Sequence, residues 1–184
     1  ESYATAEAAG DDRALFNGIN RSLDNDDVAT FKSGFGVAKF TNFKTDGSAG
    51  HDATFPDADF FLMRAAEAYL NFAEADARIN GGQTTKEGTE AINAIRKRAN
   101  ASPREDKGYS LSDICDEWSR EFYFEGRRRM DLIRFNRFGG NVNYNWQWKG
   151  GTKEGRNFSK DLNIFAIPTN ELTSNKNLIQ NPGY

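Results

Sequence analysis

Two helix patterns follow each other in the middle of the chain. Residues 57–82 (DADFFLMRAAEAYLNFAEADARINGG) carry apolar side chains at the spacing of one helix face: Phe61, Ala65, Ala68, Tyr69, Phe72 and Ala73. Residues 84–100 repeat the pattern with Ala91, Ile92, Ile95 and Ala99, and Thr84 and Glu87 have the spacing of a capping box. Because only a few residues separate the two segments, we expect antiparallel helices that form a hairpin.

A third helix is predicted after the polar loop SPREDKGY. Ser110 and Asp113 open it, and its inward side chains are Leu111, Ile114, Cys115, Trp118 and Phe122. Gly126 permits a bend before the segment RRRMDLIRFNRF. Short strands are expected at FGVAKF (35–40) and NIFAIP (163–168), with long irregular loops elsewhere. The predicted fold class is therefore mainly α.

The composition argues against several classes of function. A formal net charge of -3 gives the molecule no general attraction to polyanions, so no nucleic-acid partner is expected. One cysteine, Cys115, and one histidine, His51, make a metal site improbable, and no glycine motif points to a cofactor. No apolar run approaches the roughly 20 residues of a membrane helix. The first residues, ESYATAEAAG, read as the middle of a chain, so we expect a processed or truncated piece.

An arginine cluster stands out in residues 121–135 (EFYFEGRRRMDLIRF). Six arginines face four acidic residues between positions 117 and 137. If the chain is helical from 125 to 134, acids and arginines alternate at steps of three, which favours pairing within the helix over phosphate binding. The sequence therefore predicts a structural ion-pair network; a surface that faces another protein is the alternative. The expected members are Glu117, Glu121, Glu125, Arg128, Asp131 and Arg134.

Four groups of residues, in this order, resemble the SusD/RagB-like glycan-binding lipoproteins of the outer membrane of Bacteroidota. The first two groups are Arg64, Glu67, Tyr69, Leu70, Ala73, Glu74 and Ala75, followed by Asn93, Arg96, Arg98 and Ala99. The third is Glu117, Glu121, Phe124, Glu125, Gly126, Arg128, Asp131, Leu132, Ile133 and Arg134. The fourth is Ile167, Pro168, Glu171, Leu172, Asn175 and the ending QNPGY. Asp12, Arg13, Lys39 and Phe40 are weaker family landmarks, whereas Trp118, Phe122 and Lys176 depart from the usual residues.

The resemblance implies a fold and a function. The chain would be the C-terminal portion of a longer protein, mainly α, with tetratricopeptide-like helical hairpins. Residues 1–56 would be a loop-rich continuation of a missing part, 57–138 the helical region and 139–184 a loop with a C-terminal tail, all in one domain. Such proteins are similar in being anchored by an N-terminal lipid, in binding oligosaccharides without catalysis, and in passing them to a SusC-like TonB-dependent transporter. A helical-repeat scaffold that binds protein and no sugar is the alternative.

Three aromatic residues in the segment NYNWQW are the candidate glycan contacts. Tyr144, Trp146 and Trp148 alternate with Asn145 and Gln147, so an extended chain would place all three rings on one face. Flat rings beside amides suit the apolar faces and hydroxyls of a sugar. The alternative is that these rings pack against the helices and close the core.

A glycosidase using Glu121 and Glu125 is the remaining hypothesis. These residues lie one helical turn apart and beside several arginines, so both carboxylates would stay ionised and no general acid would be left. We therefore predict that the protein is not an enzyme.

Overall fold

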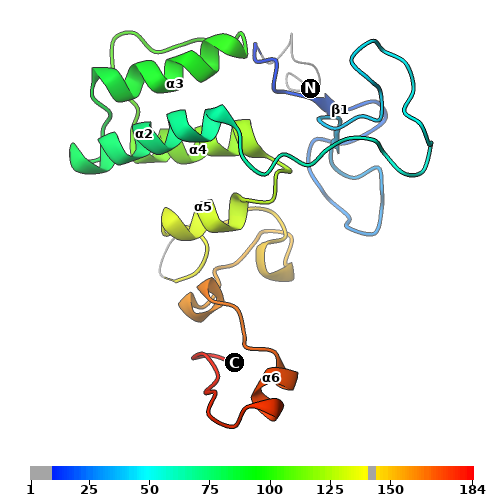
Figure 1. Cartoon of the computed structure of the whole chain (residues 1–184), viewed down its shortest axis with the longest axis vertical. Helices are drawn as coiled ribbons and strands as arrows, with labels where there is room; N and C mark the ends of the chain where they lie inside the picture. Colours follow the sequence, from blue (N-terminus) through cyan, green and yellow to red (C-terminus); the bar gives the residue numbers. More distant parts are fainter. Residues whose placement is uncertain (1–9, 141–143) are drawn as a thin grey trace. The chain divides into compact units, whose positions relative to one another are not determined.

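The computed structural model describes residues 10–140 and 144–184, and the chain is mainly helical, as predicted (Figure 1). Its contacts divide it into two compact units, Glu1–Gly126 and Arg127–Tyr184. The first unit contains β1 (Phe16–Asn17), β2 (Gly36–Val37), α2 (Ala65–Ile79), α3 (Lys86–Arg98) and α4 (Leu111–Phe122). The second contains α5 (Arg128–Arg134), the short 3-10 helices η1 (Lys149–Gly151) and η2 (Lys160–Asn163), and α6 (Thr169–Ser174).

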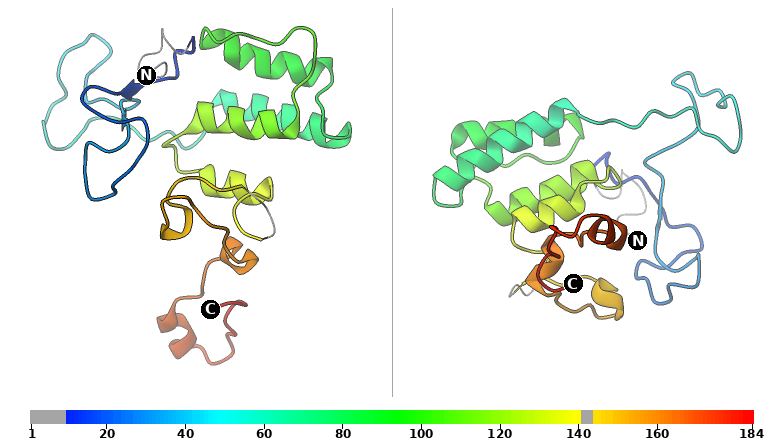
Figure 2. Two further views of the ribbon diagram at one scale, coloured as in Figure 1. Left: turned by 180° about the vertical axis from the view of Figure 1, so that it is seen from behind. Right: turned by 60° about the horizontal axis from the view of Figure 1, so that its bottom comes forward.

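Helix α2 is central to the first unit, because it packs against both α3 and α4. The predicted hairpin of α2 and α3 is confirmed, and the views in Figures 1 and 2 show the two helices side by side. The core lies here: among the residues that the structure describes, Leu132 is the one buried apolar side chain outside the first unit.

The buried face of α2 differs from the predicted one. The helix begins at Ala65, and its buried apolar residues are Ala66, Leu70, Ala73 and Ala77. Tyr69 and Phe72 point outward, with 47% and 53% of their surface exposed, and Phe61 lies before the helix with 58% exposed. Small alanines fill the interface with the neighbouring helices, so the bulky aromatic residues do not mark the core face.

The start of α3 also differs from the prediction. Thr85, not Thr84, precedes the helix, and its side chain makes no capping hydrogen bond. The Thr84 hydroxyl instead accepts a hydrogen bond of 2.8 Å from the backbone N–H of Tyr109. Thr84 therefore ties the hairpin to the segment before α4. The predicted inner residues of α3 are confirmed: Ala91, Ile92, Ile95 and Ala99 are all buried.

Helix α4 begins as the sequence predicts. Ser110 and Asp113 form a capping box, in which each side chain bonds the backbone N–H of the other residue. Its predicted inner residues Ile114, Cys115, Trp118 and Phe122 are buried, whereas Leu111 is half-buried.

One predicted strand exists and the other does not. β1 and β2 pair antiparallel, with Phe16 opposite Val37 inside the expected region 35–40. No strand forms at 163–168. There the side-chain amide of Gln180 accepts from the Ile167 N–H at 2.8 Å and donates to the Ile167 carbonyl at 3.0 Å. A side chain thus supplies the hydrogen bonds that a neighbouring strand would give.

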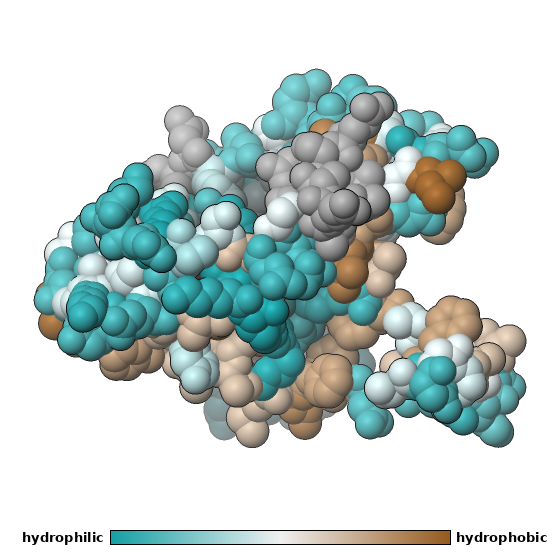
Figure 3. Space-filling model, turned by 90° about the horizontal axis from the view of Figure 1, so that it is seen from above, coloured by the Kyte–Doolittle hydropathy of each residue, from teal (hydrophilic) through white to brown (hydrophobic). Residues whose placement is uncertain are grey.

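The segment between β2 and α2 is an irregular loop that extends away from the strands before it runs to α2 (Figure 2). Several large apolar side chains of the first unit's loops are exposed, among them Ile19, Phe31, Leu62 and Met63. Hydrophobic residues accordingly stand among hydrophilic ones on the face shown in Figure 3. None of the described helices is both long enough and apolar enough to cross a bilayer.

Candidate functional site

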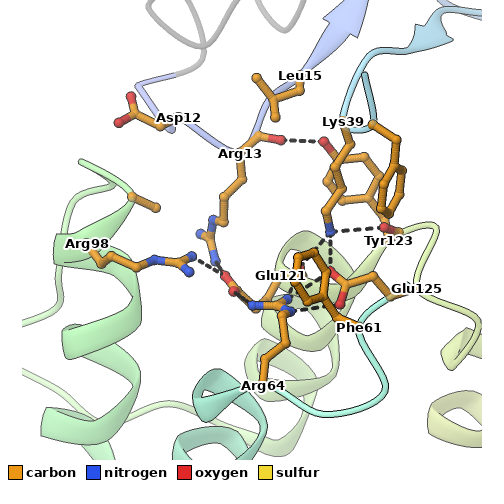
Figure 4. Close-up of a pocket in the computed structure, with 12 residues that line it drawn as sticks. Asp12, Arg13, Leu15, Lys39, Phe61, Arg64, Arg98, Glu121, Tyr123 and Glu125 are labelled. Carbon is orange, nitrogen blue, oxygen red and sulfur yellow. Dashed lines mark hydrogen bonds and ion pairs between the residues drawn. The ribbon is translucent and has the colours of Figure 1, made fainter. Parts of the chain in front are cut away.

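Glu121, in the last turn of α4, is the centre of a buried ion-pair network. Only 1% of its side chain is exposed. Three arginines donate to its carboxylate from different segments: Arg13 at 3.2 Å, Arg64 at 2.7 Å and Arg98 at 2.7 Å. Figure 4 shows these guanidinium groups converging from three sides. A buried carboxylate needs such partners, because its desolvation is costly when it is unpaired.

Glu117 lies one turn earlier on the same face of α4, with 1% of its side chain exposed. Its carboxylate accepts from Arg13 at 2.8 Å, from Arg96 at 2.8 Å and from Arg120 at 3.2 Å. Arg13 therefore bridges the two buried glutamates, and its pKa is raised because the neighbouring carboxylates outweigh the effect of burial. The side chain of Arg13 therefore ties the N-terminal loop to α4.

Glu125 completes the network from outside any helix. The prediction of a helix that includes Glu125 is wrong, because α5 begins only at Arg128 and both Phe124 and Gly126 have positive φ. The turn directs Glu125 toward Lys39 and toward Arg64, which donates twice at 2.8 Å. Burial alone would raise the pKa of Glu125, but hydrogen bonds from these two cations lower it.

The other predicted network members lie in the second unit. Asp131 is buried, with Arg134 at 2.9 Å and Arg127 at 3.4 Å from its carboxylate. Arg128 donates to the hydroxyl of Tyr144 at 3.0 Å.

The spacing of charged residues along the sequence did not identify most of the cations of the ion-pair network in the first unit. They are Arg13, Lys39, Arg64, Arg96 and Arg98, and they come from distant segments of the chain. Each had nevertheless been singled out by the family resemblance, which was the available signal. All of them except Arg96 also line the pocket of about 370 Å³ beside the network.

An aromatic patch forms the candidate ligand surface of the second unit. It consists of Tyr144, Trp146, Phe158 and Phe138, whose neighbouring ring centroids are 6.2, 6.4 and 5.2 Å apart in that order. Trp146 keeps 37% of its surface exposed, and Tyr144 is half-buried. The structure thus brings two of the three predicted aromatic residues together with two phenylalanines.

Trp148 does not follow the predicted alternation. It lies in a turn with φ of 65°, and the next residue donates its backbone N–H back to the Trp146 carbonyl at 3.1 Å. The chain is therefore not extended here, and the three rings do not share one face by strand geometry.

Lys149 supports the aromatic patch from inside. It is 1% exposed, its ammonium donates to the Tyr144 carbonyl at 2.7 Å, and it lies 4.7 Å from the centroid of Trp146. Burial lowers its pKa. The lysine thus contacts both the backbone of Tyr144 and the ring of Trp146 from the buried side.

Two half-buried arginines contact Tyr144 of the aromatic patch. Arg128 bonds the Tyr144 hydroxyl, and the Arg137 guanidinium lies 4.7 Å from the centroid of the same ring. Aromatic faces beside N–H donors can stack on the apolar face of a sugar and bond its hydroxyls. Across residues 10–140 and 144–184, no group of three or more His, Cys, Asp or Glu could hold a metal ion.

Comparisons with known proteins agree with these features. The model of the SusD family matches residues 6–184. The chain is 43% identical over 181 residues to the starch-binding protein SusD of Bacteroides thetaiotaomicron, covering 96% of this chain and 32% of that protein. It therefore spans about a third of the length of that curated relative.

Solved structures show the same fold. A SusD superfamily protein from Bacteroides vulgatus matches all of this chain and 38% of its own, with a TM-score of 0.66 at 22% identity. Surface glycan-binding protein A from Bacteroides uniformis matches 66% of this chain and 27% of its own, with a TM-score of 0.53 at 28% identity. Together with the match of the family model, these similarities show that the chain belongs to the SusD family.

Proposed function

We propose that this chain serves in non-catalytic binding of oligosaccharide or polysaccharide at the cell surface. The observation that carries the proposal is the 43% identity to a starch-binding protein over nearly the whole chain. An α-glucan is therefore the ligand to test first. The aromatic patch supplies a contact surface of suitable chemistry, with the exposed ring of Trp146 beside the polar side chains of Asn145 and Gln147.

Delivery of the glycan to a SusC-like TonB-dependent transporter, and attachment to the outer membrane by an N-terminal lipid, are further parts of the proposal. They rest on membership of the family. Co-purification of the chain with such a transporter would test the first, and loss of the complex at high glycan concentration would show that the ligand competes with the contact.

The absence of catalysis is supported by the surroundings of the two candidate carboxylates. Glu121 accepts hydrogen bonds from three arginines. Burial would raise the pKa of Glu125, but hydrogen bonds from Arg64 and Lys39 outweigh this effect and lower it. Neither group is therefore suited to be the protonated acid that glycosidic cleavage requires. Release of reducing sugar from a bound glucan would contradict this assignment.

Binding can be measured by the retardation of the protein in native gels that contain amylopectin. The double variant Tyr144→Ala/Trp146→Ala should lose retardation and keep its melting temperature. Phe31→Ala is the matched control, because it removes an aromatic ring that is 87% exposed in the other unit. If the double variant is still retarded like the parent, the aromatic patch is not the glycan-binding surface.

If the parent protein is retarded by no polysaccharide, the alternative of a helical scaffold gains support. The outward aromatic face of α2 favours that reading. Tyr69 and Phe72 line an open groove between α2 and α3, together with Glu87 and Glu90.

A further inference from the structure

A second cavity of the first unit has the size and the lining of a ligand site. Its volume is about 550 Å³, within the range of small-molecule pockets. It opens between the β1–β2 hairpin and the C-terminal ends of α3 and α4. We call it the arginine–aromatic pocket; its lining includes Phe16, Tyr123, Phe124, Arg96, Arg120, Ser102 and Ser119. Asp11 also lines it, and its carboxylate is paired with Arg13 at 2.7 Å.

Aromatic rings form one side of the arginine–aromatic pocket. The rings of Phe16 and Tyr123 lie 5.4 Å apart, and those of Tyr123 and Phe124 lie 6.4 Å apart and nearly perpendicular. Phe124 is 70% exposed and has φ of 60°, a conformation that is rare for a bulky residue. Strained backbone of this kind concentrates at ligand sites, and here it holds an apolar ring at the pocket.

In the network behind the arginine–aromatic pocket, several cations share the same carboxylate. Glu117 pairs with Arg13, Arg96 and Arg120, and Glu121 pairs with Arg13, Arg64 and Arg98. Two of these arginines are about half exposed, Arg98 at 54% and Arg120 at 50%.

Only one of these two arginines lines the arginine–aromatic pocket. Arg120 shares Glu117 with Arg96, and both guanidinium groups border the cavity. Arg98 borders the pocket of Figure 4 instead. Half of the Arg120 side chain is open to solvent, so a ligand carboxylate could form charge-assisted hydrogen bonds with it, for which the planar guanidinium is well suited.

We propose that the arginine–aromatic pocket binds a hexuronate, a sugar ring that carries a carboxylate. The carboxylate lies against Arg120 and Arg96, the apolar ring face stacks on Phe124, and the hydroxyls bond Ser102 and Ser119. This site is separate from the aromatic patch and takes an acidic rather than a neutral sugar. It does not depend on whether the aromatic patch binds glucan.

The test compares methyl glucuronide with methyl glucoside, which differ in a carboxylate at C6. Titrations followed by the amide resonances of the ¹⁵N-labelled chain should show shifts at Ser119 and Arg120 and at least tenfold tighter binding of the glucuronide. Arg120→Gln should weaken binding at least tenfold. Arg98→Gln, the matched control, also removes a half-exposed arginine from a shared carboxylate and should leave the affinity unchanged.

Phe124→Gly separates a ligand contact from a structural role. Glycine adopts positive φ without strain, so the melting temperature should not fall, while loss of the ring should weaken glucuronide binding at least tenfold. The proposal is overturned if neither sugar binds, if both bind equally, if Arg98→Gln is as harmful as Arg120→Gln, or if Phe124→Gly binds like the parent.

Discussion

Glu121 is almost completely buried, and its carboxylate is stabilised by arginines from three other segments of the chain. The N-terminal loop supplies Arg13, the residue before α2 supplies Arg64, and the end of α3 supplies Arg98. Arginine suits this task because its fixed fork of donors can serve two acceptors, as Arg64 does with Glu121 and Glu125. The network thus joins the loops to the ends of the helices.

Glu121→Gln keeps the shape of the side chain and removes its charge, which leaves three arginines without their shared counter-ion. We expect a loss of about 3–5 kcal/mol in the free energy of unfolding, measured with urea. Glu90→Gln is the control: this glutamate is 65% exposed and lies 3.9 Å from Lys86, so its loss should cost about 0.5 kcal/mol or less. Equal losses of unfolding free energy in the two variants would show that the buried network stabilises the fold no more than an exposed ion pair does.

The sequence predicted Glu117, Glu121 and Glu125 for this network but neither Asp11 nor the pairing. Spacing along a helix reports neighbours three and four residues apart. That rule gives the predicted pairs within residues 125–134, whereas Glu117 and Glu121 have partners up to 108 residues away, at Arg13. Long-range pairs follow from tertiary packing, so spacing alone could not find them.

At the scale of helices, prediction worked where one face holds the branched and aromatic residues and failed where alanines make the interface. The inner faces of α3 and α4 carry Ile92, Ile95 and Trp118, so pattern and packing agree. In α2 the aromatic residues Tyr69 and Phe72 face outward, while Leu70 and three alanines are buried. Both faces carry apolar residues at helical spacing, so spacing alone does not decide which of them is the core face.

A pair of substitutions in α2 tests this assignment. Leu70 is fully buried, so Leu70→Ala should cost about 2–5 kcal/mol of unfolding free energy by leaving a cavity. Truncation of Phe72 removes more apolar surface than truncation of Leu70. Because Phe72 is 53% exposed, however, Phe72→Ala should change stability by about 0.5 kcal/mol or less. Urea unfolding of both variants decides which face is the core, and the opposite ranking would restore the predicted one.

The capping box of α4 offers a second test at this scale. The Ser110 hydroxyl accepts from the Asp113 N–H at 3.2 Å and donates to its carboxylate at 2.6 Å. Ser110→Ala removes both bonds and should cost about 1 kcal/mol, measured as a shift in the urea midpoint. Ser110→Thr keeps the hydroxyl and should lose less; an equal loss would mean that the hydroxyl is not the stabilising group.

For the molecule as a whole, the separation into two units explains why apolar periodicity described one part better than the other. The first unit has a core of packed helices, whereas in the described part of the second several backbone groups are bonded by side chains, as Ile167 is by Gln180 and Tyr144 by Lys149. Side chains that replace strand or helix hydrogen bonds leave no periodic pattern. The sequence therefore predicts where the loops and the aromatic residues lie along the chain, but not their conformation.

The buried and paired carboxylates make the stability of the whole molecule sensitive to acid. The pKa of Asp113 is lowered chiefly by hydrogen bonds from Arg104. The pKa values of Asp11 and Glu125 are also lowered, because bonds from Arg13 and Arg64 outweigh burial. The folded state therefore binds fewer protons than the unfolded chain. These groups stabilise the fold fully above the unfolded pKa values of about 4, and the contribution is lost as pH falls through the lower folded values.

We therefore expect the urea midpoint to stay nearly level from neutral pH to about pH 5 and to fall steeply below about pH 4. Glu125→Gln removes one of the groups whose pKa is lowered. The variant should be less stable than the parent at pH 7 and should lose less further stability on acidification, so the two curves converge at low pH. Parallel curves would mean that protonation of Glu125 has no part in acid unfolding, and that the network is stabilised by packing of the arginines rather than by their charge.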